Sequence, residues 1–584
     1  MSNIIGMFCI GPNPAACLVQ DGKLIAMAEE ERFRRNKDIE LYVPFQAMHY
    51  CLNEGGIEIK DINTIAYAWD CNIYKNKIFL SNFKRFLKYN DFSCIQNVPF
   101  DESFSRLLYS CFEIGFHHPS VIKKAFRTYW NTIDNNLPIP EIKFVSHHLA
   151  HAVATYYTSG FDEATILTMD RNGEETCSAI WKGQGTNIRL IEKYQLPHSL
   201  GWFYAGFTDY LGFRPEYHEG KVMGLSAYGH PNEKIAKKIN KILKSHPNGS
   251  YSLDPSYFFY GPGCGYAYSN KMVDTFGQPL RKKNKNDIDS VYKDIAYAVQ
   301  NRLEQVVINL TARAIRLTRT HDICLVGGIS LNCLANGKLS QCDFIHKIFV
   351  PPHVNDAGTA VGAALWVAHE QGYDPRFTLT HSYWGPGYSD EKIFYELNRL
   401  RIPYQPCDEI EKIVAQDIAN GQTAGWFQGR MEMGPRALGA RSILCDARNP
   451  KMHYHINKIK GREIWRPLAP AILEESMNEY FNSKSSPFMT FAFSVNPKKR
   501  IDIPAVVHID GTTRPQTVSI NNGNPRFYNL LKEFQKITGI PVILNTSFNI
   551  ESEPIVCNIS DAIKTFYASE LDVLAIGSAL VYKK

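Results

Sequence analysis

Three features are scarce in this sequence of 584 residues: long apolar runs, paired cysteines and net charge. No apolar run reaches the roughly 18 to 20 uncharged residues that a membrane helix requires. The first 19 residues are interrupted by the segment Gly11-Pro12-Asn13-Pro14 and lack the basic start of a secretion signal. We therefore expect a soluble, cytoplasmic protein without a membrane partner.

The 14 cysteines are scattered, and no two of them form a C-x-x-C pair. This pattern argues against a zinc ribbon or a redox dithiol and is typical of reduced thiols in a cytosol. The 64 basic and 58 acidic residues leave a net charge of only +6. Because nucleic-acid-binding proteins carry concentrated basic surfaces, we expect no nucleic-acid partner.

The chain is too long for one core, and 44% of its residues are hydrophobic, as in globular proteins. Two sets of strand-like segments, at residues 4–28 and 164–181, turn back on themselves at a glycine. Each set predicts a β-hairpin that opens a sheet. The repetition predicts an internally duplicated α/β domain.

Further along the chain, residues 41–137 are rich in aromatic and basic residues at helical spacing, which predicts a helical insertion. Residues 288–317 predict a long helix, and 323–326 a short buried strand entering Gly327-Gly328. A strand followed by a glycine pair and a helix is a common phosphate-approach geometry. A change in composition predicts a border near residue 385, which gives domains of 1–384 and 385–584. The second domain is predicted to contain strands at 423–427, 505–509, 542–544 and 573–575.

The sharpest group of candidate ligands begins at His147. If a helix begins there, His147 and His151 share one face and can reach one metal ion, while His148 points elsewhere. A bare H-x-x-x-H pair also arises by chance as a packed or capping pair. Asp170 and Asp356, at the predicted ends of buried strands, favour the metal interpretation. Two imidazoles and two carboxylates suit a divalent transition metal such as Fe or Zn better than Ca or Mg.

Five segments occur in the order seen in one known family, and the chain resembles the NodU/CmcH family of O-carbamoyltransferases over nearly its whole length. They are His147-His148-Leu149-Ala150-His151-Ala152, Glu219-Gly220-Lys221-Val222-Met223-Gly224-Leu225, Gly327-Gly328-Ile329-Ser330-Leu331-Asn332-Cys333, Asn355-Asp356-Ala357-Gly358 and Gly434-Pro435-Arg436-Ala437-Leu438-Gly439.

The resemblance implies an α/β protein with a duplicated actin-like (ASKHA, Kae-type) domain followed by a YrdC-like α/β domain. In the family, the YrdC-like part converts carbamoyl phosphate and ATP to carbamoyl-adenylate, with Mg as an additional ion for ATP. The Kae-like part transfers the carbamoyl group to a hydroxyl of a small metabolite in specialised biosynthesis. By position, the Fe(II) or other metal ligands are His147, His151, Asp170 and Asp356.

Basic residues of the second domain lie among glycines, prolines and apolar residues, where an unpaired guanidinium is costly to bury. Such residues are better explained as anion ligands, since Arg grips phosphate oxygens bidentately. The resemblance assigns to the donor-forming pocket Arg436, Lys460, Arg466, Arg514, Asn545 and Ser547. For Arg441 and Arg462, the sequence supports a structural role and a ligand-binding role equally.

In the first domain, Gly327 and Gly328 would let the backbone approach the adenylate phosphate, with Asn332 and Lys221 as polar contacts. The alternatives are a structural turn at the glycines and a surface ion pair between Glu219 and Lys221. Lys37 matches a family position that faces the acceptor.

The sequence departs from the family where a base is expected. The family's His-Asp near the start is Pro12-Asn13 here, and neither can act as a base, which leaves His148 and His218 as candidates. Arg171 replaces a glycine near the metal, and Asp38 replaces a histidine.

Three other functions were weighed. A tRNA-modifying threonylcarbamoyl transferase needs an RNA-binding surface, which the small net charge disfavours. A hydrogenase-maturation carbamoyltransferase carries zinc-finger cysteines that are missing here. An inactive binding or scaffold protein would not need the four ligands and the basic residues. The expected partner is a small hydroxylated acceptor, and the expected assembly is a homodimer.

Overall fold

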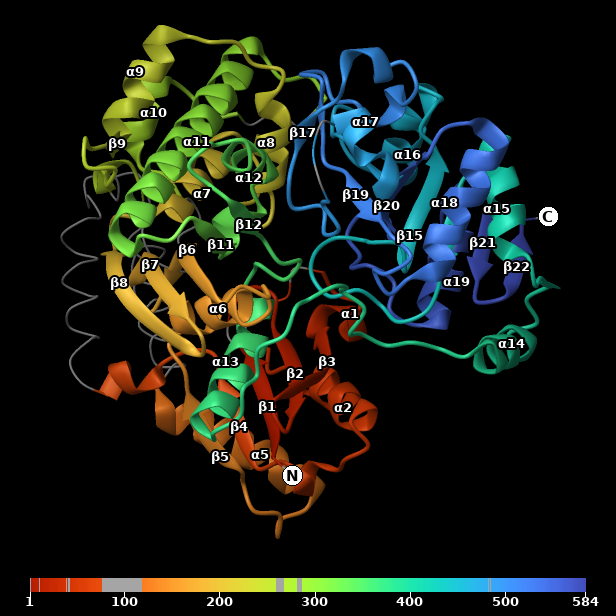
Figure 1. Cartoon of the computed structure of the whole chain (residues 1–584), viewed down its shortest axis with the longest axis horizontal. Coiled ribbons are helices and arrows are strands. Elements are labelled where there is room, and N and C mark those ends of the chain that lie inside the picture. The colour runs from red at the N-terminus through yellow and green to blue at the C-terminus, as the bar shows by residue number, and fades with distance from the viewer. Residues whose placement is uncertain are drawn as a thin grey trace.

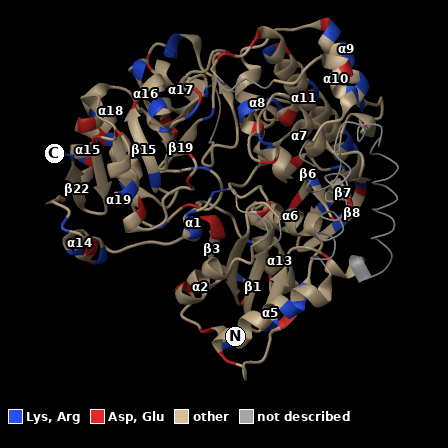
Figure 2. Cartoon of the chain, turned by 180° about the vertical axis from the view of Figure 1, so that it is seen from behind, with Lys and Arg blue, Asp and Glu red and all other residues tan. Residues whose placement is uncertain are grey.

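Figure 1 shows the computed structural model of the chain, which describes residues 2–9, 11–37, 39, 42–75, 118–258, 267–280, 286–481, 483 and 485–583. Two five-stranded sheets and one eight-stranded sheet organise three parts of the molecule. Among the described residues, no helix is long and apolar enough to cross a membrane. Basic and acidic residues are interspersed over all three parts (Figure 2).

The first sheet has the strand order β3-β2-β1-β4-β5. Strands β1 and β2 pair antiparallel, as do β2 and β3, whereas β4 and β5 extend the sheet in parallel from β1. Strands β1 and β2 are almost entirely apolar and buried because helices α2 (Phe45–Glu54) and α13 (Ala357–Glu370) pack on them. Their bounds are β1 (Asn3–Phe8), β2 (Ala15–Gln20), β3 (Lys23–Glu29), β4 (Thr64–Tyr67) and β5 (Glu141–Phe144).

The second sheet repeats this topology with the order β12-β11-β6-β7-β8. An antiparallel meander again opens the sheet, and two parallel strands follow on the side of its first strand. The internal duplication expected from the two hairpins is therefore confirmed. The bounds are β6 (Glu163–Gly173), β7 (Thr176–Gln184), β8 (Asn187–Gln195), β11 (Asp322–Val326) and β12 (Lys347–Phe349).

Two helices lie where the duplicated halves meet. Helix α6 (His147–Tyr156) packs closely on α13 (Ala357–Glu370). The two backbones nearly touch at Gly362, where an added Cβ would lie 1.8 Å from the carbonyl oxygen of Ala150. The predicted long helix is confirmed as α11 (Ser290–Thr318). The remaining elements of this part are α1 (Glu30–Arg34), α2 (Phe45–Glu54), α5 (Pro119–Ile133), α7 (Leu200–Tyr210), α8 (Glu219–Ser226), α9 (Glu233–Ile242), β9 (Leu243–Ser245), β10 (Tyr251–Leu253), α10 (Asn270–Phe276) and α12 (Cys333–Leu339).

The C-terminal lobe, residues 405–583, is built on the mixed sheet β13-β22-β21-β14-β15-β20-β16-β19. It is α/β, as expected. Its strands are β13 (Gln405–Pro406), β14 (Ala424–Phe427), β15 (Arg441–Asp446), β16 (Ala469–Leu473), β19 (Gln516–Val518), β20 (Val542–Ser547), β21 (Val573–Ile576) and β22 (Ala579–Tyr582), beside the small pair β17 (Phe493–Ser494) and β18 (Thr512–Thr513). Its helices are α15 (Ile410–Ala419), α16 (Lys451–Ile459), α17 (Met477–Phe481), α18 (Pro525–Thr538) and α19 (Ile559–Ala568), and α14 (Asp390–Arg399) precedes it.

Two expectations were wrong in detail. The segment 41–137 is not a wholly helical insertion, because β4 lies within it and pairs with β1 as part of the first sheet. Its aromatics Phe79, Phe83 and Phe86 lie outside the described residues. The segment 505–509 is no strand, since Pro504–Val506 forms a short 3-10 helix, which the proline at its start favours. The border near residue 385 stays a prediction.

Gly434 joins the C-terminal lobe to both other parts. Its N–H donates to Glu29 (3.1 Å), and its carbonyl accepts from Arg32 (3.0 Å). Its φ is +89°, and a Cβ there would lie 2.3 Å from the carbonyl oxygen of Pro352, in the loop that leads to Asp356. Only glycine fits this contact without a shift of backbone.

We expect Gly434→Ala to lower the free energy of unfolding by about 2–4 kcal/mol, because backbone strain and a backbone clash add. Urea denaturation measures this loss. Gly421→Ala is the matched control, since its φ is +91° but nothing lies within 4 Å of the added Cβ. That variant should lose only about 1 kcal/mol, and equal losses in the two variants would contradict the contact with Pro352.

Candidate active site: a donor cluster and a basic cluster

Four side chains converge at the junction of the duplicated halves. His147, His151, Asp170 and Asp356 each offer one ligand atom, and these atoms all lie within 4.8 Å of one another. We call this group the donor cluster. The two imidazoles meet at 3.1 Å between their Nε2 atoms, and Asp170 Oδ2 lies 3.0 Å from Nε2 of His151. Asp356 Oδ1 lies 3.7 Å from Nε2 of His147 and 3.6 Å from that of His151.

Local structure explains why these side chains meet. Helix α6 begins at His147, as predicted, which puts His147 and His151 on one face. Asp170 lies in β6 where the register with β7 shifts between Met169 and Gly173, so the backbone pairing is interrupted at this residue. Asp356 was expected at a strand end, but it is the N-cap residue of α13, seven residues beyond β12. The loop between β12 and α13, against which Gly434 packs, places Asp356 in the donor cluster.

The electrostatics of the donor cluster favour a cation. With neutral imidazoles its two carboxylates leave two negative charges in a buried place. Burial opposes a charged imidazolium, yet Asp170 and Asp356 raise the pKa of His151 to about 9. Although burial acts against ionisation of Asp170 too, His147 and His151 hold the pKa of this carboxyl well below its usual range. The cluster therefore attracts positive charge, and its nitrogen and oxygen donors suit a divalent transition metal.

Glu174 orients the start of α6. Its Oε1 accepts hydrogen bonds from the backbone N–H of His147 (2.9 Å) and of Asp70 (2.8 Å). The rings of Phe8 and Trp69 lie 5.7 Å and 5.1 Å from the ring of His147. These neighbours fix the imidazole, and sequence reasoning missed all three, because only tertiary contacts bring them together.

Neither His148 nor His218 has a free ring-nitrogen lone pair with which to deprotonate an acceptor hydroxyl. His148 is buried, and its ring nitrogens lie 2.7 Å from Thr168 Oγ1 and 2.8 Å from the carbonyl oxygen of Thr176. Burial lowers its pKa to about 3. His218 accepts from the N–H of Arg214 through Nδ1 (3.1 Å), so its Nε2 carries the proton and is a donor. Burial and then Lys221 lower the pKa of His218 to about 4.

Four arginines of the C-terminal lobe form a second group, which we call the basic cluster: Arg436, Arg462, Arg466 and Arg514. Burial and the charges of Arg514 and Arg466 lower the pKa of Arg436 to about 9. Burial, Arg466 and Arg514 also lower the pKa of Arg462 well below its usual value. An anion bound among these arginines would relieve this mutual repulsion.

Two nitrogens of the basic cluster lack protein partners. Nε of Arg514 and one terminal nitrogen of Arg462 are buried without a hydrogen-bond partner among the described residues. Glu463 lies 3.7 Å from Arg466 but pairs more closely with Lys221 (2.7 Å). Arg462 lies among the arginines of this cluster, whereas carbonyl oxygens surround the buried guanidinium of Arg441, which stacks on Phe427.

Other predicted binding residues are already engaged within the protein. The Lys460 ammonium donates to the carbonyl oxygens of Ser547 (2.6 Å) and Asn549 (2.9 Å) and lies within hydrogen-bond distance of both side chains. Asn545 donates to Gln516 (2.8 Å), but its buried Oδ1 has no partner among the described residues. Asn549 was missed because its link to Lys460 spans 89 residues.

In the first domain the glycine pair lies beside the donor cluster. Gly327 has a φ of +92°, and a Cβ on Gly328 would lie 3.1 Å from Asp170 Oδ1. Asn332 does not point to this place, because its amide exchanges hydrogen bonds with Gln300 and caps α12. The alternative of a surface ion pair between Glu219 and Lys221 was wrong, because Lys221 pairs with Glu463 and both side chains are largely buried. Lys37 is exposed, yet it is near enough to contribute to the lowered pKa of both His218 and Lys460.

Burial raises the pKa of Glu219 to about 7, against the opposing charge of Arg171. A carboxyl whose pKa is higher in the folded protein stabilises it at low pH, and this contribution is lost as pH rises from about 4.5 to about 7. We expect Glu219→Gln to match the wild type at pH 4.5 and to be more stable at pH 8, by at most about 3 kcal/mol. Urea denaturation at both values measures this. The exposed Glu233→Gln is the control, and the same difference at both pH values would contradict the assignment.

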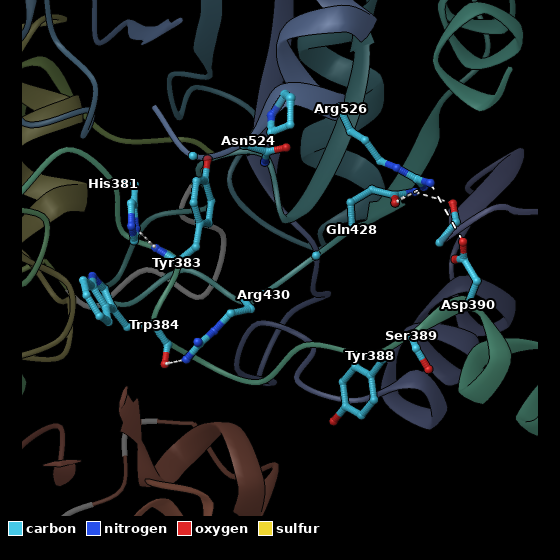
Figure 3. A pocket seen from close by; sticks show the side chains of 14 residues that line it. His381, Tyr383, Trp384, Tyr388, Ser389, Asp390, Gln428, Arg430, Asn524 and Arg526 are labelled. Atoms are coloured by element: carbon cyan, nitrogen blue, oxygen red, sulfur yellow. Dashed lines mark hydrogen bonds and ion pairs between the residues drawn. The ribbon is translucent and has the colours of Figure 1, made fainter. Parts of the chain in front are cut away.

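A cavity of about 650 Å³ lies elsewhere, between the linker to the C-terminal lobe and the start of α18 (Figure 3). The rings of His381, Tyr383 and Trp384 line one side, and Arg430 and Arg526 approach from the other. Arg430 forms an ion pair with Glu54 and donates a hydrogen bond to the carbonyl oxygen of Trp384. Arg526 donates hydrogen bonds to Gln428 and Ser578. None of the predicted site residues lines this cavity.

Comparison with known proteins agrees with this description. Residues 4–365 match the family described as carbamoyltransferase N-terminus, and residues 415–583 match carbamoyltransferase C-terminus. Nodulation protein NolNO of Sinorhizobium fredii is 35% identical over 98% of this chain and 79% of its own length. Nodulation protein U of the same species is 26% identical over 92% of this chain and 91% of its own. The solved structure of full-length HypF, with 11% identity and a TM-score of 0.33 over 64% of this chain and 47% of its own, is too dissimilar to carry an argument.

The repeated sheets and the mixed sheet make the chain an α/β protein in which four candidate ligand atoms converge. The family matches cover most of its length. The chain belongs to the carbamoyltransferase family, and the resemblance predicted from the five motifs is confirmed.

Proposed function

We propose that this protein is an O-carbamoyltransferase that uses ATP and carbamoyl phosphate and acts on a hydroxyl of a small specialised metabolite. The observation that carries the proposal is the convergence of His147, His151, Asp170 and Asp356 within 4.8 Å. Support comes from the basic cluster, which repels itself and has unpartnered buried donors. A transferase needs a basic cluster to bind a polyanionic donor and a metal-binding cluster to activate a poor electrophile.

In this proposal the basic cluster binds the phosphates of ATP and carbamoyl phosphate, and carbamoyl-adenylate forms there. Arg436, Arg466 and Arg514 hold the phosphate oxygens, with Arg462 beside them. Lys460 fixes the segment of Ser547 and Asn549 through its hydrogen bonds. The segment around His218 links the surroundings of the two clusters, because Glu216 pairs with Arg171, while Lys221 pairs with Glu463, 3.7 Å from Arg466.

A carbamoyl group is a poor electrophile because its nitrogen donates into the carbonyl. Adenylation improves the leaving group, and Fe(II) or another divalent transition metal held by the donor cluster would polarise the carbonyl, worth several kcal/mol in the transition state. Glu174 and the rings of Phe8 and Trp69 keep His147 oriented for this task. Gly328, on which a Cβ would meet only the Asp170 side chain, lets the adenylate phosphate approach the backbone.

The proposal is tested with purified protein, a divalent transition metal, ATP, carbamoyl phosphate and a panel of alcohols that includes sugars, macrolides, alkaloids and cephem alcohols. We expect mass spectrometry to find a carbamoylated alcohol and AMP, and to find neither when ATP or carbamoyl phosphate is omitted. Release of AMP without any carbamoylated alcohol from the whole panel would contradict transfer to these acceptors. A cytoplasmic location, a homodimer and the lack of a nucleic-acid partner stay predictions.

A further inference from the structure

Arg171 occupies an unusual place directly after a residue of the donor cluster. Its N–H donates to Asp170 Oδ1 (2.7 Å), and its carbonyl accepts from Ser199 Oγ (2.5 Å). A Cβ added to Gly201, at the start of α7, would lie 2.4 Å from the Cα of Arg171. The backbone is therefore clamped, and the side chain must leave it beside Asp170.

The guanidinium of Arg171 has spare hydrogen-bonding capacity. It forms an ion pair with Glu216 through one terminal nitrogen and lies 5.1 Å above the ring of Trp202. Among the described residues, no hydrogen bond occupies its other nitrogens. A guanidinium carries five donors, and both members of the pair are about a quarter exposed, at 28% and 26%. An ion pair with this exposure contributes little, so a doubly charged phosphate can compete with Glu216.

Arg171 also lies on the side of the donor cluster that faces the basic cluster. Asp170 Oδ1, which accepts from the N–H of Arg171, is the atom nearest to the open position on Gly328. Glu216 belongs to the loop that leads into α8, and Lys221 of α8 pairs with Glu463 (2.7 Å), which lies 3.7 Å from Arg466 of the basic cluster. An adenylate that travels from the basic cluster to the donor cluster passes this loop.

We propose that Arg171 binds the phosphate of carbamoyl-adenylate beside the donor cluster and stabilises AMP as it leaves. This inference rests on the proposed function. In the transfer step the acceptor oxygen bonds to the carbamoyl carbon, and the bond from that carbon to the phosphate oxygen breaks. The electron pair stays on that oxygen, and the hydroxyl proton passes to water. The phosphate thereby changes from one negative charge to two, so a guanidinium binds it more strongly as the reaction proceeds. Glu216 holds the guanidinium in position until the phosphate arrives.

The test uses AMP and the full chain with Mn(II) in the donor cluster. Paramagnetic broadening of the ³¹P signal reports only AMP that is next to the metal, so AMP at the basic cluster does not interfere. We expect Arg171→Gly to need at least about tenfold more AMP for half-maximal broadening, Arg171→Lys an intermediate amount, and Glu216→Gln less than the wild type. Arg189→Gly, which removes one exposed positive charge from β8, should equal the wild type.

A second readout is the transfer rate in a single turnover, which should fall at least about tenfold in Arg171→Gly while adenylate formation is unchanged. An AMP affinity of Arg171→Gly equal to the wild type, or no broadening by the wild type, would overturn the inference. The proposed function fails separately, by the lack of any carbamoylated alcohol from the wild type, because AMP broadening does not depend on turnover.

Discussion

The Arg514→Ala variant is expected to lose formation of carbamoyl-adenylate, by at least about a hundredfold, while it keeps its bound metal. Arg514 is central in the basic cluster, because its charge contributes to the lowered pKa of Arg436, Arg462 and Arg466. Its buried Nε has no partner among the described residues, so removal of the side chain breaks no protein hydrogen bond of that atom. The loss should therefore appear in phosphate binding rather than in folding.

Exchange of labelled pyrophosphate into ATP, in the presence of carbamoyl phosphate, measures this half-reaction. Arg526→Ala is the matched control, because Arg526 lines the separate cavity near α18 and should not affect exchange. Normal exchange in Arg514→Ala would show that the basic cluster does not form the adenylate.

The His151→Ala variant is expected to behave in the opposite way. It should retain pyrophosphate exchange, bind less than a tenth of the wild-type metal and transfer the carbamoyl group at least about a thousandfold more slowly. The reason is that His151 supplies one of four converging ligand atoms and is the imidazole closest to Asp170 (3.0 Å).

Metal analysis of the purified variant and a single-turnover transfer assay test these expectations. His148→Ala is the matched control on the same helix. It should be less stable, because it breaks hydrogen bonds to Thr168 and Thr176, but it should still bind one metal ion. Loss of the same half-reaction in His151→Ala and Arg514→Ala would contradict two separate sites.

The sequence predicted the duplicated sheets because hairpins at 4–28 and 164–181 have strong local signals. The helix start at His147 was predictable because the spacing of His147 and His151 is also a local signal. By contrast, β4 could not be distinguished from its helical surroundings, because a four-residue buried strand has no periodicity of its own. The apolar residues of 505–509 resemble a strand, but Pro504 favours the 3-10 helix Pro504–Val506, and a loop follows it.

The candidate site was predictable in residue types but not in roles. The four ligands and the arginines stand in recognisable motifs, whereas the hydrogen bonds of Lys460, the pairing of Lys221 with Glu463 and the cap that Glu174 provides join distant segments. No local pattern encodes such contacts. The proton positions that exclude His148 and His218 as bases likewise depend on tertiary partners.

The most direct test of the central claim is anomalous diffraction from crystals of the protein grown with Fe(II), measured on both sides of the iron absorption edge. We expect one peak per chain, at bonding distance, about 2.0–2.2 Å, from Nε2 of His147 and His151 and from carboxylate oxygens of Asp170 and Asp356. A crystal that holds iron elsewhere, or none at this position at saturating Fe(II), would contradict the account.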